Sequence, residues 1–263
     1  MSDVNDIINN LASITESMDI DQEFQTAANE YISIFTDYLD MYYINPDEDI
    51  AQEGGSLVSS KEHPVLVVLT TGDNPLSNLI KKATGDAFTH SSISFNTDLN
   101  PMYSFGEKNG GTSKISGKEK SSLGFVRTYP TDKLWHTDKE KVPYSIYGTL
   151  VSFDVYNKMK NRLDFFLRNQ FDLRYSFKQL INVKLNIKSH SQAKWFCSRF
   201  VADILNAGNK LPKDPSLYRP QSFVDMSGMH YLASGDSIEK YDKRPVEEGL
   251  KDLSYNMKQD LIG

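Results

Sequence analysis

Lys194-Trp195-Phe196-Cys197-Ser198-Arg199-Phe200-Val201-Ala202-Asp203-Ile204-Leu205, which runs on to Gly208, is the stretch that decides the fold. Its apolar residues recur at helical spacing, and one face of the predicted helix carries Phe196, Cys197, Phe200, Val201, Ile204 and Leu205. Cys197 falls near the centre of that face, so we expect it to point inward against a sheet. It also lies near the start of the helix, where unpaired backbone N–H groups and the helix dipole favour a thiolate.

Cys197 is the only cysteine in 263 residues, which excludes internal disulfide bonds. Two interpretations are open, because a buried cysteine is common in protein cores and a papain-like nucleophile also lies on a helix that packs against a sheet. A nucleophile needs a base. The best candidate is His90, where Phe88 to Phe95 alternates like a strand. A lone histidine on a strand is also common as a polar filler.

The composition is that of a soluble globular protein, with 39% hydrophobic residues, 24% charged residues and a mean hydropathy of -0.48. No apolar run approaches the length of a transmembrane segment. The first residues lack the basic and apolar regions of a secretory signal, so we expect synthesis in a cytoplasm. A net charge of -6 argues against a nucleic-acid partner, because binding phosphates needs a dominant basic face.

The first 55 residues differ from the rest of the chain in charge and in apolar pattern. From Asp3 to Glu53 there is no Lys or Arg, and apolar residues between Val4 and Leu39 recur at helical spacing. We predict two acidic amphipathic helices, which either pack on the rest of the chain or dock on another subunit. The residues from Asn45 to Ser56 break this pattern. The predicted domains are therefore a docking arm at 1–55, a main domain at 56–225 and a C-terminal extension at 226–263.

The main domain is predicted to be α+β, because strands and helices follow one another without regular alternation. Pro64 to Thr71 is a continuous apolar run typical of a central strand. Further strands are expected at Pro101–Phe105, a hairpin partner of the His90 strand, and at Gly124–Tyr129 and Tyr144–Phe153; helices are expected at 76–83, 156–171 and 175–185. Residues 106–124 are interpreted as a mobile loop and not as a phosphate loop, since no Lys-Ser or Lys-Thr pair follows Gly111.

The order of these pieces resembles a known family. Ala87-Phe88-Thr89-His90-Ser91-Ser92-Ile93-Ser94 and Trp195-Phe196-Cys197-Ser198-Arg199-Phe200-Val201 are similar to the histidine strand and the cysteine helix of the circularly permuted NlpC-type papain-like fold. This is the branch that includes lecithin retinol acyltransferase, and in it the histidine comes first. The resemblance covers roughly residues 63–225. It implies an antiparallel sheet packed on the helix that bears Cys197.

The resemblance also implies a site. Cys197 would attack an acyl carbonyl, and His90 would take its proton and later return one to the leaving group. The third residue, which orients the imidazole, would be Ser104, with Asn96 and Glu107 as alternatives. The Cys197 amide would help to form the oxyanion hole. His190 is an alternative base. His63, His136, His190 and His230 are scattered, so we predict no metal and no cofactor.

Two classes of function follow. The first is a thiol hydrolase or acyltransferase that acts on an amide or ester, with a peptidoglycan peptide or another acyl group as substrate. The second is a catalytically silent structural or interaction protein of a bacteriophage tail or baseplate, which docks on other virion subunits through the N-terminal helices. A virion-incorporated enzyme would combine the two, because the particle would carry it to the cell wall without secretion.

Overall fold

The computed structural model describes residues 62–72, 85–107, 123–132, 141–189 and 191–260, together with Ser77, Lys81 and the short strands β4 (Lys114–Ile115) and β5 (Lys118–Glu119). The chain divides into two compact units, Met1–Ser59 and Ser60–Gly263, and the described residues belong to the second. The predicted N-terminal helices, most of the predicted helix at 76–83, His136 and His190 lie outside the described residues.

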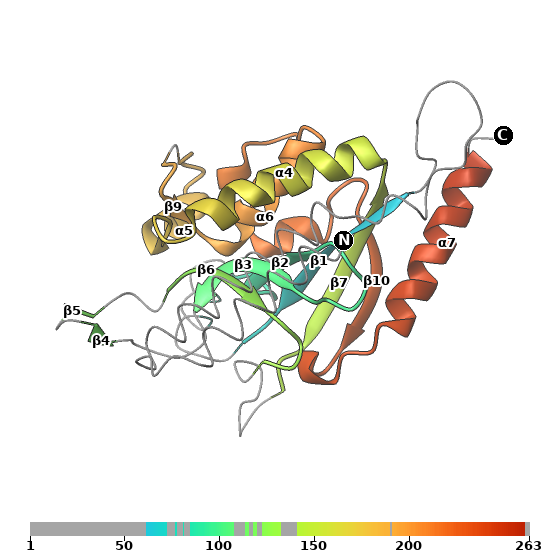
Figure 1. Ribbon diagram of the computed structural model, residues 1–263, viewed down its shortest axis with the longest axis horizontal. Helices are drawn as coiled ribbons and strands as arrows, with labels where there is room; N and C mark the ends of the chain where they lie inside the picture. Colours follow the sequence, from blue (N-terminus) through green and yellow to red (C-terminus); the bar gives the residue numbers. More distant parts are fainter. Residues whose placement is uncertain are drawn as a thin grey trace, which may run out of the picture. The chain divides into compact units, whose positions relative to one another are not determined.

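One six-stranded sheet forms the centre of the second unit, with strand order β10-β7-β1-β2-β3-β6 (Figure 1). Its strands are β1 (His63–Thr70), β2 (His90–Ser94), β3 (Met102–Glu107), β6 (Leu123–Thr128), β7 (Tyr144–Val151) and β10 (His230–Gly235). Every neighbouring pair is antiparallel. β1 lies between β2 and β7, and residues 65–69 have no exposed surface, which confirms the predicted central strand. The α+β class is likewise confirmed.

The helices are α4 (Phe153–Asn169), α5 (Phe177–Lys184), α6 (Cys197–Gly208) and α7 (Arg244–Asp260), with short 3₁₀ turns η2 (Pro215–Leu217), η3 (Pro220–Phe223) and η4 (Ile238–Lys240). The helix that bears Cys197 begins at that residue, because Lys194–Trp195 form a short strand, β9, parallel to β8 (Arg174–Tyr175). Phe196 is extended and serves as the N-cap. Cys197 is therefore in the first turn of α6.

The two faces of the sheet pack against different partners (Figure 1). α4 and α6 cover the face that we call the aromatic face, where Phe105 and Phe125 meet Phe166 of α4 and Phe200 of α6. Ring centroids are 4.8 Å apart between Phe166 and Phe200, and Trp195 lies 4.7 Å from Phe166. Burial of each such ring contributes about 1.5–3 kcal/mol. This aromatic cluster fixes α6 against the sheet.

Helices α4 and α6 also bind one another directly. A Cβ built on Gly208 would lie 2.3 Å from Met159 Cε, so the end of α6 approaches α4 more closely than a larger residue would allow. Arg162 of α4 forms an ion pair with Asp203 of α6, with 2.5 Å between Arg162 Nε and a carboxylate oxygen. The predicted apolar face of α6 is buried as expected, since Cys197 is 1% exposed and its neighbours on that face are 0–2% exposed.

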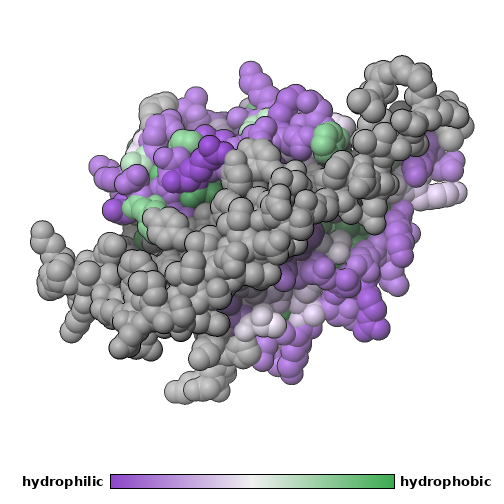
Figure 2. All heavy atoms as spheres, viewed as in Figure 1, coloured by the Kyte–Doolittle hydropathy of each residue, from purple (hydrophilic) through white to green (hydrophobic). Residues whose placement is uncertain are grey.

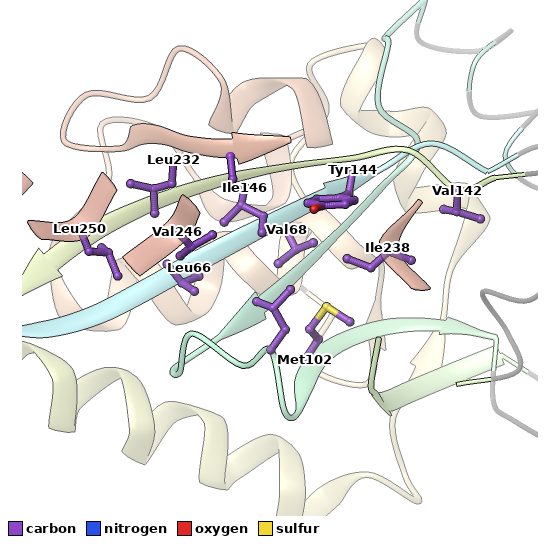
Figure 3. Packing of buried hydrophobic residues seen from close by; sticks show 12 residues of the cluster. Leu66, Val68, Met102, Val142, Tyr144, Ile146, Leu232, Ile238, Val246 and Leu250 are labelled. Carbon is purple, nitrogen blue, oxygen red and sulfur yellow. The ribbon is translucent and has the colours of Figure 1, made fainter. Parts of the chain in front are cut away.

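The opposite side of the sheet, which we call the aliphatic face, holds a second core (Figure 3). The cluster contains Leu66, Val68, Leu99, Met102, Val142, Tyr144, Ile146, Leu232, Ala233, Ile238, Val246 and Leu250. α7 packs on this face against β7 and β10. Residues 226–263, which the sequence analysis sets apart as an extension, thus supply an edge strand, η4 and α7 to the same sheet and core.

Candidate functional site

Cys197 places its thiol between the first turn of α6 and strand β2. The thiol has hydrogen-bond partners in the backbone N–H groups of Ser91, Ser198 and Cys197 itself, and in the Ser91 hydroxyl. The helix start supplies two of these amides because first-turn N–H groups have no partner within the helix. The predicted position of Cys197, inward and at a helix start, therefore agrees with the structure.

The surroundings keep this thiol protonated. Burial raises the pKa of Cys197, since a thiolate loses its hydration in the core. Hydrogen bonds from the Ser91 and Ser198 amides and from the Ser91 hydroxyl act in the opposite direction but do not overcome the burial. Burial raises the pKa of Tyr175, and the charge of a Cys197 thiolate nearby would raise the pKa of that tyrosine further. The resting group is a neutral thiol.

His90 lies on the other face of the sheet. Side chains alternate along a strand, so Ser91, Ile93 and Phe95 share one face while His90, Ser92 and Ser94 share the other. Phe95 contacts Tyr156 of α4, with ring centroids 5.4 Å apart, which assigns the odd-numbered residues to the aromatic face.

Contacts of His90 itself agree with this assignment. Ser92 Oγ lies 3.3 Å from His90 Nε2, and the two residues are on the same side of β2. A Cβ built on Gly106 would lie 3.3 Å from His90 Cε1. Because Phe105 points toward α6, the neighbouring Gly106 faces the opposite side. The imidazole thus lies over Gly106 on the aliphatic face.

The structure therefore does not bring Cys197 and His90 together. The residue of β2 that meets the thiol is Ser91, one position further along the strand. Burial lowers the pKa of His90 to about 4, so the imidazole is neutral at physiological pH. It could accept a proton, but the thiol that the resemblance assigns to it is on the far side of the sheet.

The other predicted site residues have separate roles. Ser104 is fully buried, and its hydroxyl donates to the Ser91 carbonyl oxygen at 2.6 Å. Asn96 is joined through its side-chain amide to the backbone of Asn100. The side chain of Glu107 lies outside what the structure describes. His63 packs its ring on Phe153 and Tyr156 of α4, and His230 is exposed on β10.

The segment after α6 borders the Cys197 end of the helix. Ser198 Oγ donates to the Tyr218 carbonyl oxygen at 2.8 Å, which ties the start of α6 to this segment. The next residue, Arg219, forms an ion pair at 2.9 Å with Asp86, a carboxylate that is 6% exposed. Asp86 precedes β2 in the chain. The segment that follows α6 is thus tied to the start of that helix through Tyr218 and to the residues before β2 through Arg219.

Ser91 is the residue beside the thiol that the sequence analysis missed, and the ion pair of Asp86 with Arg219 is a further contact that it did not predict. The two-residue period of β2 identifies Ser91 only once the face that carries Ile93 and Phe95 is known to pack on the helices. Ile93 is the apolar residue of that strand, and counting back by two from the side that packs on the helices gives Ser91 and not His90. No comparable signal pairs Asp86 with Arg219, which are far apart in sequence.

Within the described ranges no group of three or more His, Cys, Asp or Glu side chains could hold a metal ion. In the same residues no helix has both the length and the apolar character that crossing a membrane requires. No protein-family model, curated protein or solved structure gives a significant match to the chain.

Proposed function

We propose that this protein is a structural or interaction subunit of a larger assembly and that its cysteine is not a catalytic nucleophile. One observation carries the proposal: His90 and Cys197 lie on opposite faces of the sheet. A cysteine hydrolase needs a base within hydrogen-bond reach of its thiol. Ser91, which takes the facing position here, has no titratable group for that role.

The electrostatics of the thiol support the same conclusion. Catalytic cysteines have a lowered pKa, because a neighbouring imidazolium or another cation stabilises the thiolate. Burial raises the pKa of Cys197 instead. The amides at the start of α6 would suit an oxyanion hole, but without a thiolate they have no acyl-enzyme to stabilise.

We further propose that the domain is a permuted papain-like scaffold. The antiparallel sheet packed on a helix whose first residue is the cysteine supports this reading, and so does the order of the His90 strand and the Cys197 helix in the chain. A bacteriophage tail or baseplate is the assembly that this scaffold and the acidic N-terminal segment suggest. The scaffold would then serve for docking.

The rate of Cys197 alkylation by iodoacetamide as a function of pH tests the catalytic part of the proposal. We expect slow reaction at neutral pH, a rate that rises only above the pKa of an ordinary cysteine, and the same curve for His90→Ala. Rapid alkylation at neutral pH that falls sharply in His90→Ala would establish a Cys-His pair. That result would make the thiol hydrolase the correct function.

The assembly part has its own test. The full chain is followed by gradient sedimentation in the cells or particles that contain it. We expect it to sediment in a complex much larger than its own 29.9 kDa mass. Sedimentation as a free chain in every fraction would contradict the assembly role, whatever the alkylation experiment shows.

A further inference from the structure

A basic surface with exposed apolar side chains lies around α5, from the end of α4 to the turn that follows α5. We call it the α5 surface and define it by three apolar residues and three basic ones, namely Phe171, Leu185, Ile187, Arg174, Lys178 and Lys188. Phe171 is 46% exposed, Leu185 63% and Ile187 49%, whereas most large apolar side chains of the described residues are buried. Figure 1 shows α5, β9 and the C-terminal end of α4 together at this end.

Local backbone structure fixes the exposed leucine and isoleucine. The N–H groups of Leu185 and Ile187 both donate to the Asn182 carbonyl oxygen, at 3.1 and 2.9 Å. Asn186 between them has a φ of 56°, the left-handed conformation that closes a helix and that asparagine tolerates well. The two apolar side chains are thus held outward on either side of a defined turn.

The cations are fixed in part by the β8–β9 ladder. Arg174 and Lys194 are register partners on the two short parallel strands, and both side chains are exposed. Arg174 Nη1 donates to the Phe171 carbonyl oxygen at 2.5 Å, which ties the guanidinium to the backbone of the exposed Phe171. Between residues 168 and 194 the sequence has six Lys or Arg and one acidic residue, Asp172. Figure 2 shows hydrophobic side chains among hydrophilic ones over this end of the molecule.

An acidic partner segment with apolar residues at helical spacing would match such a surface. The sequence contains one, since residues 1–60 have 13 Asp or Glu and no Lys or Arg, in a chain whose net charge is only -6. Its apolar residues from Val4 to Leu39 follow a helical period. Charge complementarity therefore selects this segment over a neutral or basic partner.

We propose that the α5 surface binds the acidic N-terminal segment of a second copy of this chain. The inference rests on the proposed assembly role and names a partner for it. The segment and the surface are different parts of the chain, so the contact is heterologous and leaves one segment and one surface available for further copies. Copies joined in this way form a ring if the rotation closes and an open array if it does not.

Sedimentation velocity of the full chain tests the proposal with two complementary charge reversals. The surface variant carries Arg174→Glu, Lys178→Glu and Lys188→Glu; the segment variant carries Asp21→Lys, Glu23→Lys and Glu30→Lys. We expect the natural chain to associate, and to do so more weakly as salt rises from about 0.05 to about 0.5 M. Each variant alone should associate at least about tenfold more weakly. An equal mixture of the two should recover association, because the three new lysines of one variant then meet the three new glutamates of the other, and the unchanged segment of the surface variant meets the unchanged surface of the segment variant.

A matched control carries the same charge change elsewhere. Lys240→Glu, Lys251→Glu and Lys258→Glu replace three exposed cations in and before α7, away from the α5 surface, and should leave association unchanged. Thermal unfolding of every variant shows whether it is folded. A surface variant that folds and associates as the natural chain does would overturn the proposal, as would mixed variants that stay apart.

Two further outcomes would also overturn it. One is a natural chain that remains monomeric at every concentration and salt. The other is binding of the α5 surface to vesicles of phosphatidylcholine and phosphatidylserine, abolished in the surface variant, without self-association. Both are independent of Cys197 alkylation, so failure of this inference is distinguishable from failure of the proposed lack of thiol chemistry.

Discussion

The two faces of the sheet divide between them the residues that a papain-like site would hold together. The aromatic face holds Cys197 at the start of α6, the helix whose Phe200 packs on Phe105, with Ser91 beside the thiol. The aliphatic face holds His90 over Gly106, with Ser92 as its polar neighbour. Both residues are where local sequence patterns predict them, one on a helix start and one on a strand.

The difference teaches that a shift of one residue along a strand decides whether two such groups can react. Residues i and i+1 of a strand point to opposite faces, and the strand is too well paired here to rotate. The backbones of β2 and α6 can therefore lie close together whether or not a histidine of β2 reaches the Cys197 thiol. Four changes break or sharpen this contrast, from the largest expected effect to the smallest.

Removing a ring from the aromatic face should have the largest effect on stability. Phe166→Ala deletes a fully buried ring that contacts Phe105, Phe125, Trp195 and Phe200, and we expect a loss of about 3–5 kcal/mol. The matched change on the aliphatic face, Leu66→Ala, should cost about 2–5 kcal/mol. Denaturant unfolding measures both. A loss below about 1 kcal/mol in either variant would contradict the description of that face as core.

Acid should destabilise the aliphatic face through His90. Its folded-state pKa of about 4 lies below the ordinary value of 6.5, so the unfolded chain binds the proton first as pH falls. Stability from this group is fully present above pH 6.5 and is lost between pH 6.5 and about 4, by up to about 3 kcal/mol. The unfolding free energy, measured across this pH range, should depend less steeply on pH in His90→Gln than in the natural chain. Ser92→Ala keeps the imidazole and should keep the slope.

Overpacking the aliphatic face should have a smaller cost. A Cβ on Gly148 would lie 2.5 Å from Leu232 Cδ1 and 2.9 Å from Leu66 Cδ2, so Gly148→Ala forces both leucines to move. We expect a loss of about 1–3 kcal/mol in thermal or denaturant unfolding. Adding Leu232→Val, which shortens the closest side chain, should recover part of that loss. If the losses of Gly148→Ala and Leu232→Val simply add in the double variant, crowding against Leu232 is not the cause of the Gly148→Ala loss.

Moving the histidine by one residue should change the chemistry more than the stability. The double variant His90→Ser with Ser91→His places the imidazole on the face of Cys197, where its positive form would lower the pKa of the thiol. Alkylation at neutral pH should then accelerate about tenfold for each unit by which that pKa falls. Ser92→His adds a histidine on the original face and is the control. Equal rates in the folded double variant and the control would refute the assignment of faces.

Much of the fold follows from sequence because it depends on local period. The continuous apolar run of β1, the buried face of α6 and the hairpin of β2 and β3 were all readable in this way. The place of residues 226–263 was not, since the pairing of β10 with β7 is a long-range choice that no local pattern encodes. The sequence predicts helix at Lys194–Trp195, whereas these two residues pair with β8, a contact between segments about 20 residues apart that the local pattern does not encode.

The candidate site shows the same limit more sharply. The sequence correctly indicates that Cys197 is buried at a helix start and that His90 is on a strand. Whether they meet depends on which face of β2 packs on α6, and the polar run around Ser91 and Ser92 gives little apolar contrast between the faces. Tertiary packing of Ile93 and Phe95 against the helices makes that choice.

The order of strands in the sheet also determines when during synthesis the chain can fold. β7 pairs on one side with β1, which leaves the ribosome long before it, and on the other with β10, which leaves long after. Until residue 235 has emerged, the nascent chain holds β7 as an open strand edge and an aliphatic core that lacks Leu232, Val246 and Leu250. Such edges attract other chains. Productive folding is therefore a late event in synthesis, and a chain that stalls before β10 is a substrate for chaperones or proteases.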